Sequence, residues 1–306
     1  MNCILEIDFC NWLEDNNKES SMKYSIFTVS LPDLSPNDAL REMKSAGYEG
    51  VEWRVVDQKP STDGKPSFWS GNLCTWPLKT FIEDAGEIRR ITESAGFEMP
   101  NVGTYVNCEN LEAVNTAMTG AAKAGAKQLR VGVPGYDPKN SFLEIRDRAL
   151  CQYREVEELA REHDVRALIE IHVGNITPSA SGMAAFVRHF DPAHVGAIYD
   201  SGNVVCEGYE QYRMGLELLG PYLAHVHLKN TAWQPVGTRP DGSAEWEAVD
   251  VPFQKGIANF AVFFQALKSV GYDGWISFED FSTERSTLEK LRENIAFIRG
   301  IEKSIS

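Results

Sequence analysis

The sequence predicts a single α/β domain of the (β/α)8 barrel class. Eight short apolar runs alternate with eight amphipathic helical segments over about 280 residues, which is the arithmetic of such a barrel. A small residue followed by glycine recurs where helices are expected to end, as at 46–47, 95–96 and 124–125. An open, doubly wound sheet is the competing architecture, but Ser30-Leu-Pro-Asp stands where a G-x-G-x-x-G would open the first helix. We therefore expect a closed parallel barrel.

The elements can be assigned in chain order. Continuous apolar runs, typical of strands buried on both faces, predict strands at 24–30, 51–55, 99–104, 128–133, 167–172, 195–200, 224–229 and 275–279. Pro100 is unfavourable within the third of these strands because it has no N–H to donate. Ser35 and Pro36 are typical of a helix start. Helices are expected at 36–47, 78–96, 111–125, 142–163, 182–190, 209–219, 259–271 and 283–299.

The chain shows no sign of a second domain. No Gly/Ser-rich linker or change in composition divides it, so residues 22–306 are expected to form the barrel. Residues 1–21 carry Glu6, Asp8 and Glu14 and lack the basic start and apolar centre of a secretory signal. We interpret them as an N-terminal extension, with Met22 as a candidate original start.

Composition excludes several function classes. A net charge of -14 repels phosphate backbones, so nucleic acid is not expected as a partner. No apolar run reaches the roughly 20 residues that span a bilayer, so no membrane partner is expected either. The six cysteines form no close pair, which favours reduced thiols and a cytoplasmic location.

Four predicted strands in the second half end in side chains that bind metal ions. Glu170, Asp200, His227 and Glu279 each stand at or near the carboxyl end of a run. In a barrel these ends converge on one face, so three carboxylates and one imidazole would meet. Such an oxygen-rich set suits Mn²⁺ or Mg²⁺, with Co²⁺ or Zn²⁺ also tolerated. A single Glu at a strand end is more often a cap or an ion-pair partner, but four in successive units favour one metal site.

Neighbouring side chains allow two readings each. His172 shares a strand face with Glu170 and is either a proton carrier or a hydrogen-bonded structural histidine. Lys229 either extends from the barrel rim or holds an oxyanion or phosphate at the mouth. His225 lies two positions deeper than His227 and is expected in the core or behind the ligands.

The first half contributes charged residues whose role is open. Glu52 and Arg54 share one face of the second strand, and Arg130 lies on the fourth. Buried charges must be paired, so one interpretation is a Glu–Arg pair inside the barrel. The alternative is that these residues bind substrate oxygens.

Two long segments, 56–76 and 230–251, are expected as loops on the active face. Both contain tryptophans, Trp233 among them, which could stack on sugar rings or anchor the loops by packing.

Five stretches resemble the xylose isomerase-like barrel superfamily, the sugar phosphate isomerase/epimerase group. They are 46–53, 168–172, 199–203, 225–229 and 271–280. The resemblance implies a metal held by Glu170, Asp200, His227 and Glu279, two glutamates that also move a proton, a small carbohydrate substrate, and a dimer or tetramer.

Two departures from the ketose 3-epimerases of this group stand out. Asn203 replaces a histidine that they often have, at a position that faces substrate. Lys229-Asn-Thr-Ala replaces an Arg-containing stretch. Both departures weigh against ketohexose epimerisation. Endonuclease IV shares the barrel but uses three zinc ions and many histidines, whereas no histidine precedes His163 here.

Three functions remain as hypotheses. The first is a metal-dependent sugar isomerase or epimerase in which Glu170 or Glu279 moves a proton through an enediolate. The second is a dehydratase or lyase on a keto-inositol or an oxidised glycoside, in which His172 or Lys229 assists the departing group. The third is a non-catalytic sugar-binding barrel, against which the presence of both glutamates argues.

Overall fold

The computed structural model describes residues 22–305, and eight parallel strands in it form a closed barrel. The strand order is β1-β11-β8-β7-β6-β5-β4-β2, and pairing of β1 with β2 closes the ring. This confirms the predicted fold class; the N-terminal extension expected at 1–21 lies outside the described residues. The strands are β1 (Lys23–Phe27), β2 (Gly50–Val55), β4 (Val102–Thr104), β5 (Gln128–Arg130), β6 (Arg166–Glu170), β7 (Val195–Asp200), β8 (Leu223–Leu228) and β11 (Trp275–Phe278).

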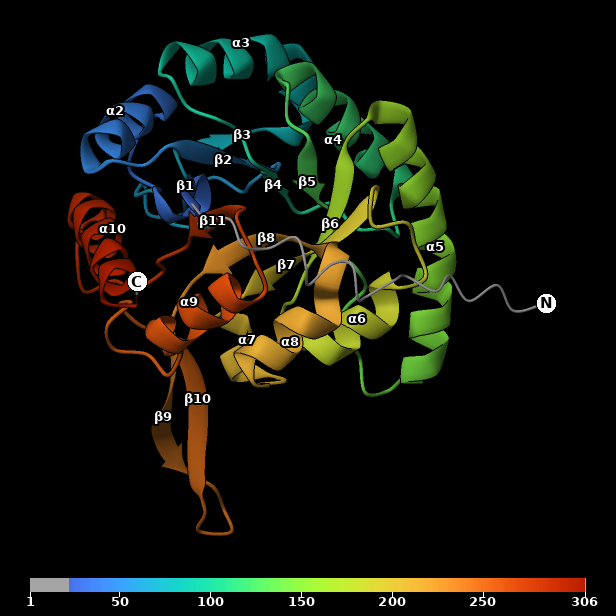
Figure 1. The fold of residues 1–306 in the computed structure, drawn as a ribbon, viewed down its shortest axis with the longest axis vertical. Coiled ribbons are helices and arrows are strands. Elements are labelled where there is room, and N and C mark those ends of the chain that lie inside the picture. The colour runs from blue at the N-terminus through green and yellow to red at the C-terminus, as the bar shows by residue number, and fades with distance from the viewer. Residues whose placement is uncertain (1–21, 306) are drawn as a thin grey trace.

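Helices surround the barrel as an outer layer (Figure 1). Their ends follow local chemistry: Ser35 accepts a hydrogen bond from the Asp38 amide at 3.2 Å, and Gly47 closes the same helix at a φ of 96°. The main helices are α2 (Pro36–Ala46), α3 (Phe81–Ser94), α4 (Leu111–Ala124), α5 (Phe142–His163), α6 (Ala180–Val187), α8 (Tyr212–Leu219), α9 (Phe260–Ser269) and α10 (Thr287–Ser304). The short α7 (Asn203–Cys206) follows β7. Within residues 22–305, no helix has both the length and the apolarity needed to cross a bilayer.

Several predicted boundaries move for identifiable reasons. The third predicted strand begins at Val102, after Pro100, because proline cannot donate to the neighbouring strand. The last helix begins at Thr287 rather than 283, where Ser286 and Glu289 form a reciprocal capping box. The first strand ends at Phe27, and a 3₁₀ turn (Thr28–Ser30) follows it.

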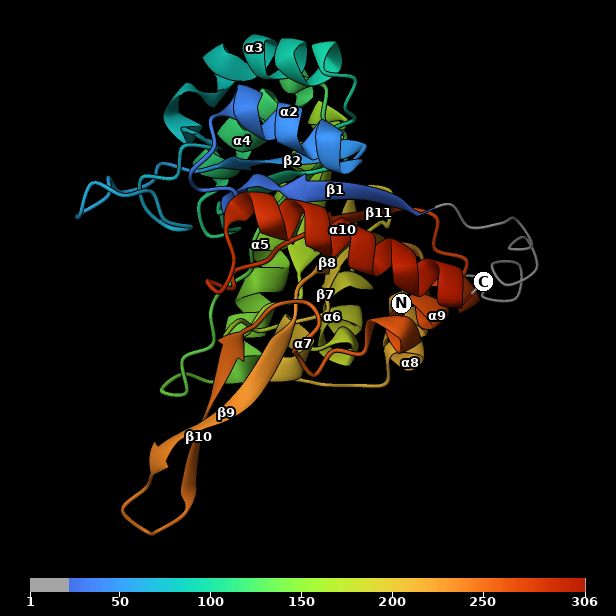
Figure 2. The same cartoon turned by 90° about the vertical axis from the view of Figure 1, so that its left-hand side faces the viewer.

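The segment 230–251 is not a loop, contrary to the prediction. It forms an antiparallel hairpin of β9 (Thr231–Thr238) and β10 (Ala244–Asp250), which projects away from the barrel (Figures 1 and 2). Asp241-Gly242 is a turn signal and residues 244–248 alternate apolar and polar side chains, but residues 231–238 do not alternate, so only half of a hairpin pattern is present in the sequence. The other long segment, 56–76, is mostly irregular and ends in β3 (Thr75–Trp76).

The two faces of the strands differ sharply in chemistry. Outward-facing residues such as Trp53 pack under the helices, and its indole N–H donates to Thr92 Oγ1 at 2.9 Å. Inward-facing residues near the barrel centre are polar, although the interior of such barrels is usually apolar. Ser25, Glu52, Asn101, His225 and Ser277 have no exposed surface. A polar interior directly beneath the carboxyl ends of the strands indicates that the barrel is built to support a charged site.

Candidate metal centre

The structure brings the four predicted ligands together. Glu170, Asp200, His227 and Glu279 each offer an atom within 4.8 Å of those of the others. The reason is strand order: β6, β7, β8 and β11 are neighbours, and their register aligns Asp200 with His227 and His227 with Ser277. All four side chains are buried, the most exposed being Glu170 at 5%. As metal ligands these residues remain a prediction, but their convergence is a property of the fold.

His227 lies between carboxylates on both sides. Its Nδ1 is 3.1 Å from Glu170 Oε1 and 3.6 Å from Glu279 Oε1, while Nε2 is 3.2 Å from each oxygen of Glu52. Burial would lower the pKa of His227, but the charges of Glu52 and Glu279 raise it well above its usual value. Without a metal ion, these carboxylates therefore favour the protonated form of the ring.

The two carboxylate oxygens of Asp200 differ in their surroundings. Its Oδ1 accepts from the amides of Gly202 at 2.8 Å and Asn203 at 2.7 Å. Its Oδ2 is buried and takes part in no hydrogen bond, although the Lys229 ammonium lies 3.0 Å away. Buried polar atoms are normally hydrogen-bonded, so an oxygen that has only the Lys229 ammonium beside it can also accept a cation. The donor set and this oxygen together match the needs of a divalent ion.

The surroundings of Glu279 favour its protonated form. Burial raises its pKa to about 7, with Glu170 and Asp200 adding to the rise and His227 and Lys229 opposing it. Three carboxylates this close cannot all ionise without nearby positive charge.

The surroundings of Glu170, in contrast, favour its ionised form. Burial would raise its pKa, but the Arg130 guanidinium and His227 hold it well below its usual range. The Arg130 Nη1 donates to Glu170 Oε2, and its Nε donates to the Thr104 carbonyl at 2.8 Å. The predicted Glu–Arg pair inside the barrel thus exists, but its acid is Glu170 and not Glu52.

Lys229 points inward, so it does not extend outward from the rim. Only 7% of it is exposed, and its ammonium lies 3.0 Å from Asp200 Oδ2 and 3.6 Å from Glu279 Oε2. Burial would lower the pKa of Lys229, but those two carboxylates raise it. The residue is a fixed positive charge beside the cluster.

A cavity of about 200 Å³ opens next to Glu170. His172 is exposed and shares this cavity with Arg130 and Asn175, as expected from its strand face. Its Nδ1 lies 2.8 Å from the Val173 carbonyl, which leaves Nε2 free. Tyr105, which the sequence analysis missed, also lines the cavity. The signal was available, because Tyr105 directly follows a barrel strand.

Three other residues predicted to bind substrate lie at separate places in the structure. Arg54 donates to Thr75 Oγ1 at 3.0 Å and lies 5.2 Å from the centre of the Tyr105 ring, close to the cavity wall. Asn203 donates to the Ile171 carbonyl at 3.1 Å and stands 3.4 Å from Glu170 Oε1. Trp233 lies on β9 and donates to the Val205 carbonyl at 3.1 Å.

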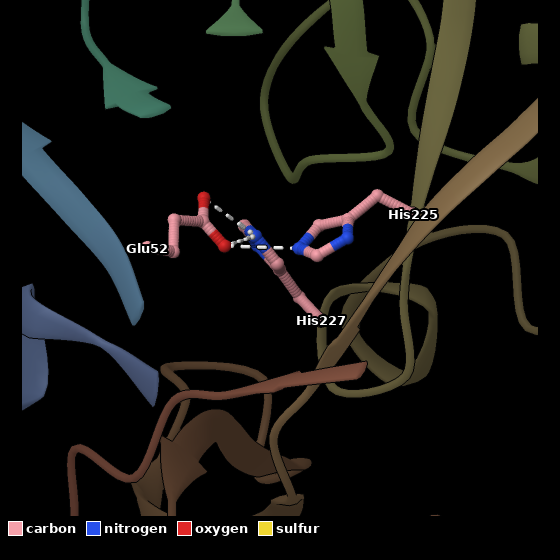
Figure 3. A group of neighbouring side chains, drawn as sticks. All are labelled: Glu52, His225 and His227. Carbon is pink, nitrogen blue, oxygen red and sulfur yellow. Dashed lines mark hydrogen bonds and ion pairs between the residues drawn. The ribbon is translucent and has the colours of Figure 1, made fainter. Parts of the chain in front are cut away.

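Glu52 does not reach the mouth of the barrel. It has no exposed surface and faces His225, His227 and Asn101 in the interior (Figure 3). Burial would raise the pKa of Glu52, but the two histidines hold it well below its usual range. This geometry does not support the expectation that Glu52 contacts substrate.

A larger cavity, about 650 Å³, lies at the opposite end of the barrel. It is lined by residues that precede or begin strands, among them Lys127, Arg166 and Gly274. Within residues 22–305 no group of potential metal ligands lies there, so size alone would select the wrong end.

Comparison with known proteins agrees with the barrel. The sequence model of the family described as xylose isomerase-like TIM barrel matches residues 40–301. An inosose dehydratase of Mesomycoplasma hyopneumoniae (strain J) is 22% identical over 279 residues, covering 88% of this chain and 89% of that protein. An inosose dehydratase of Geobacillus thermodenitrificans is 26% identical over 162 residues. This match covers 50% of the present chain and 53% of the length of the dehydratase.

Solved structures share the architecture. The 3-keto-D-glucoside 4-epimerase of E. coli superposes with a TM-score of 0.67 at 14% identity, covering 92% of this chain and 100% of that one. The IOLI protein with a bound zinc atom gives a TM-score of 0.67 at 17% identity, covering 93% and 98%. At these identities the likeness shows the fold.

Proposed function

Since the chain belongs to the xylose isomerase-like TIM barrel family, we propose that it is a divalent-metal-dependent isomerase or epimerase of a sugar or sugar derivative. The observation that carries the proposal is the convergence of three carboxylates and one imidazole at the carboxyl face of the barrel. Active sites of this fold lie at that face. The names of the similar proteins, a sugar epimerase and inosose dehydratases, support a polyhydroxylated ketone or aldehyde as the substrate class.

Glu170, Asp200, His227 and Glu279 would hold the ion. Bound there, a divalent cation would act as a Lewis acid that polarises a carbonyl and makes the neighbouring C–H more acidic. The donor set suits Mn²⁺ or Mg²⁺, and Co²⁺ or Zn²⁺ would also be accepted.

The chain itself supplies the proton transfers. Glu170 and Glu279 stand on strands separated by β7 and β8, so their carboxylates approach the cluster from two sides. One carboxylate would remove the proton and the other would return it on a different face or carbon. Arg130, Tyr105 and His172 line the adjacent cavity and would bind the hydroxyl groups and the ring of the substrate.

A dehydratase acting on a keto-inositol is the second candidate. The observation in its favour is the alignment with inosose dehydratases, which reaches 88% of this chain. The first step is the same proton removal, but a hydroxyl on the neighbouring carbon leaves as water. His172 is exposed in the cavity, and its Nδ1 donates to the Val173 carbonyl, so its Nε2 would have to take up a proton from solvent and then pass it to the departing hydroxyl.

The test uses one reaction mixture for both candidates. The purified protein is loaded with Mn²⁺ or Mg²⁺ and incubated in D2O with ketoses, 3-keto-glycosides and keto-inositols, and NMR follows the products. A new epimer or isomer that carries deuterium, formed without loss of water, supports the isomerase; an unsaturated ketone formed with loss of water supports the dehydratase. No exchange and no product with any metal or substrate would refute the proposed chemistry.

A further inference from the structure

A second group of titratable side chains lies directly beneath the proposed ligands. Glu52, His225 and His227 also offer atoms within 4.8 Å of one another, and none has any exposed surface (Figure 3). His227 belongs to both groups. Neither Glu52 nor His225 has a part in the chemistry proposed above, so their burial needs its own explanation.

The orientation of His227 divides its two nitrogens between the groups. Nδ1 faces Glu170 and Glu279, whereas Nε2 faces the two oxygens of Glu52 at 3.2 Å. A neutral imidazole coordinates a cation through one nitrogen while the other carries the proton. The ring is held in this orientation by stacking on Phe27, with centres 5.6 Å apart and planes 26° apart.

Glu52 is itself held across the barrel. It comes from β2, while both histidines come from β8, three strands away around the ring. Asn101 donates to Glu52 Oε1 at 2.7 Å, and His225 Nε2 lies 3.0 Å from Oε2. His225 Nε2 is also 3.0 Å from Ser277 Oγ, which is 2.6 Å from Ser25 Oγ. A carboxylate with this many partners has little freedom to move.

We propose that Glu52 is a positioning residue for the metal ligand His227. It accepts the Nε2–H of His227. The Nδ1 lone pair is then kept pointing toward the space between Glu170, Asp200 and Glu279, where the ion would lie. Carboxylates hydrogen-bonded to the far nitrogen of a ligating histidine orient the ring and increase its basicity. The inference rests on the metal centre proposed above.

The same contacts argue against a second cation between Glu52 and the histidines. The distances of 3.0 to 3.2 Å are those of N–H···O hydrogen bonds, and Asn101 already donates to Glu52. One imidazole could serve two cations only by losing both protons. With Nδ1 of His227 turned to the upper group, the lower group lacks a full set of ligands.

The experiment measures binding of Zn²⁺ or Mn²⁺ alone, by competition with a chelator. Glu52→Gln keeps the shape of the side chain and removes its charge, and we expect binding to weaken by about 10- to 100-fold. Glu98→Gln makes the same change at an exposed carboxylate and should leave binding unaltered. Wild-type affinity in folded Glu52→Gln, within twofold, would overturn the role of Glu52 and leave the metal centre standing. If the wild type binds neither ion, both the role of Glu52 and the proposed metal centre are refuted.

A second measurement begins with the wild-type protein. Histidine-labelled ¹⁵N NMR of the Zn²⁺-loaded wild type reports which nitrogen of each ring carries a proton. We expect His227 to keep its proton on Nε2 and to bind zinc through Nδ1, with His225 unligated. Zinc bound to Nε2 of His227 or to His225 would overturn the inference. A residue with a merely structural role would not change this signature, so Glu52→Gln, if folded, should show an altered Nε2 resonance.

Discussion

The two halves of the barrel meet at the same face but bring opposite charge to it. The second half, β6 to β8 and β11, ends in Glu170, Asp200 and Glu279 around His227. The first half brings cations and an aromatic ring: Arg54 and Arg130 lie 5.2 and 4.4 Å from the centre of the Tyr105 ring. In the function proposed above, the anionic half would hold the metal and the cationic half would bind an oxygen-rich substrate beside it.

The comparison also shows how the halves depend on each other. The Arg130–Glu170 ion pair joins the two halves at the carboxyl face of the barrel. The contacts of Glu52 with His225 and His227 join the halves in the interior. Lys229 is the exception in the anionic half, where it neutralises Asp200 and Glu279.

Removing a carboxylate from the anionic half should have the largest effect. In Glu279→Gln we expect turnover to fall by about 100- to 10,000-fold, because a proton-transfer group and a metal ligand are lost together. Steady-state kinetics and metal content measured by mass spectrometry test this. Glu247→Gln, on the exposed hairpin, is the control. Unchanged turnover in Glu279→Gln would favour a barrel that only binds sugars.

Removing the cation that joins the halves should affect stability more than metal content. Arg130→Met leaves Glu170 buried without its partner, and we expect the metal-free protein to lose about 3 to 5 kcal/mol of unfolding free energy. Urea denaturation measures it, with Arg41→Met at an exposed ion pair as the control. Added Mn²⁺ should restore part of the loss by neutralising Glu170. An equal loss with and without metal would contradict the proposed metal site.

The anionic half should bind its cation in competition with protons. The pKa of His227 is raised well above its usual value and that of Glu279 is raised to about 7. A metal binds the deprotonated forms, so apparent affinity should rise with pH and fall as pH drops through about 7. Near pH 6 the change should approach about tenfold per pH unit for each proton displaced. Calorimetric titration of Mn²⁺ at pH 6, 7 and 8 measures it, and a pH-independent affinity would contradict this picture.

The smallest effect is expected at the hairpin. Trp233→Phe removes the hydrogen bond to the Val205 carbonyl, which should lower the unfolding free energy by about 1 kcal/mol. Turnover should change less than twofold if Trp233 serves as a packing anchor. A several-fold rise in KM without loss of stability would instead support the substrate contact expected from its sequence position. Trp246→Phe, on the neighbouring strand, is a matched control.

Local pattern predicted most of the elements. The strand Val195–Asp200 and the helix Phe142–His163 have their predicted bounds, because apolar runs and helical periodicity report burial directly. The hairpin 231–250 was missed because most of its residues are exposed and no continuous buried face marks the two strands. Lys229 was placed correctly at a strand end, but its inward direction depends on Asp200, which belongs to another strand.

The order of the residues was enough to predict the barrel and the four side chains that meet at its carboxyl face. Side chains alternate along a strand, and parallel strands all end on one side, so local order already implies convergence. The pairs of interacting side chains could be seen only in the folded chain: Arg130 contacts Glu170, 40 residues away, and Glu52 contacts His225, 173 residues away. Those pairings arise only when the ring closes and fixes the strand register, which places the two halves of the barrel face to face.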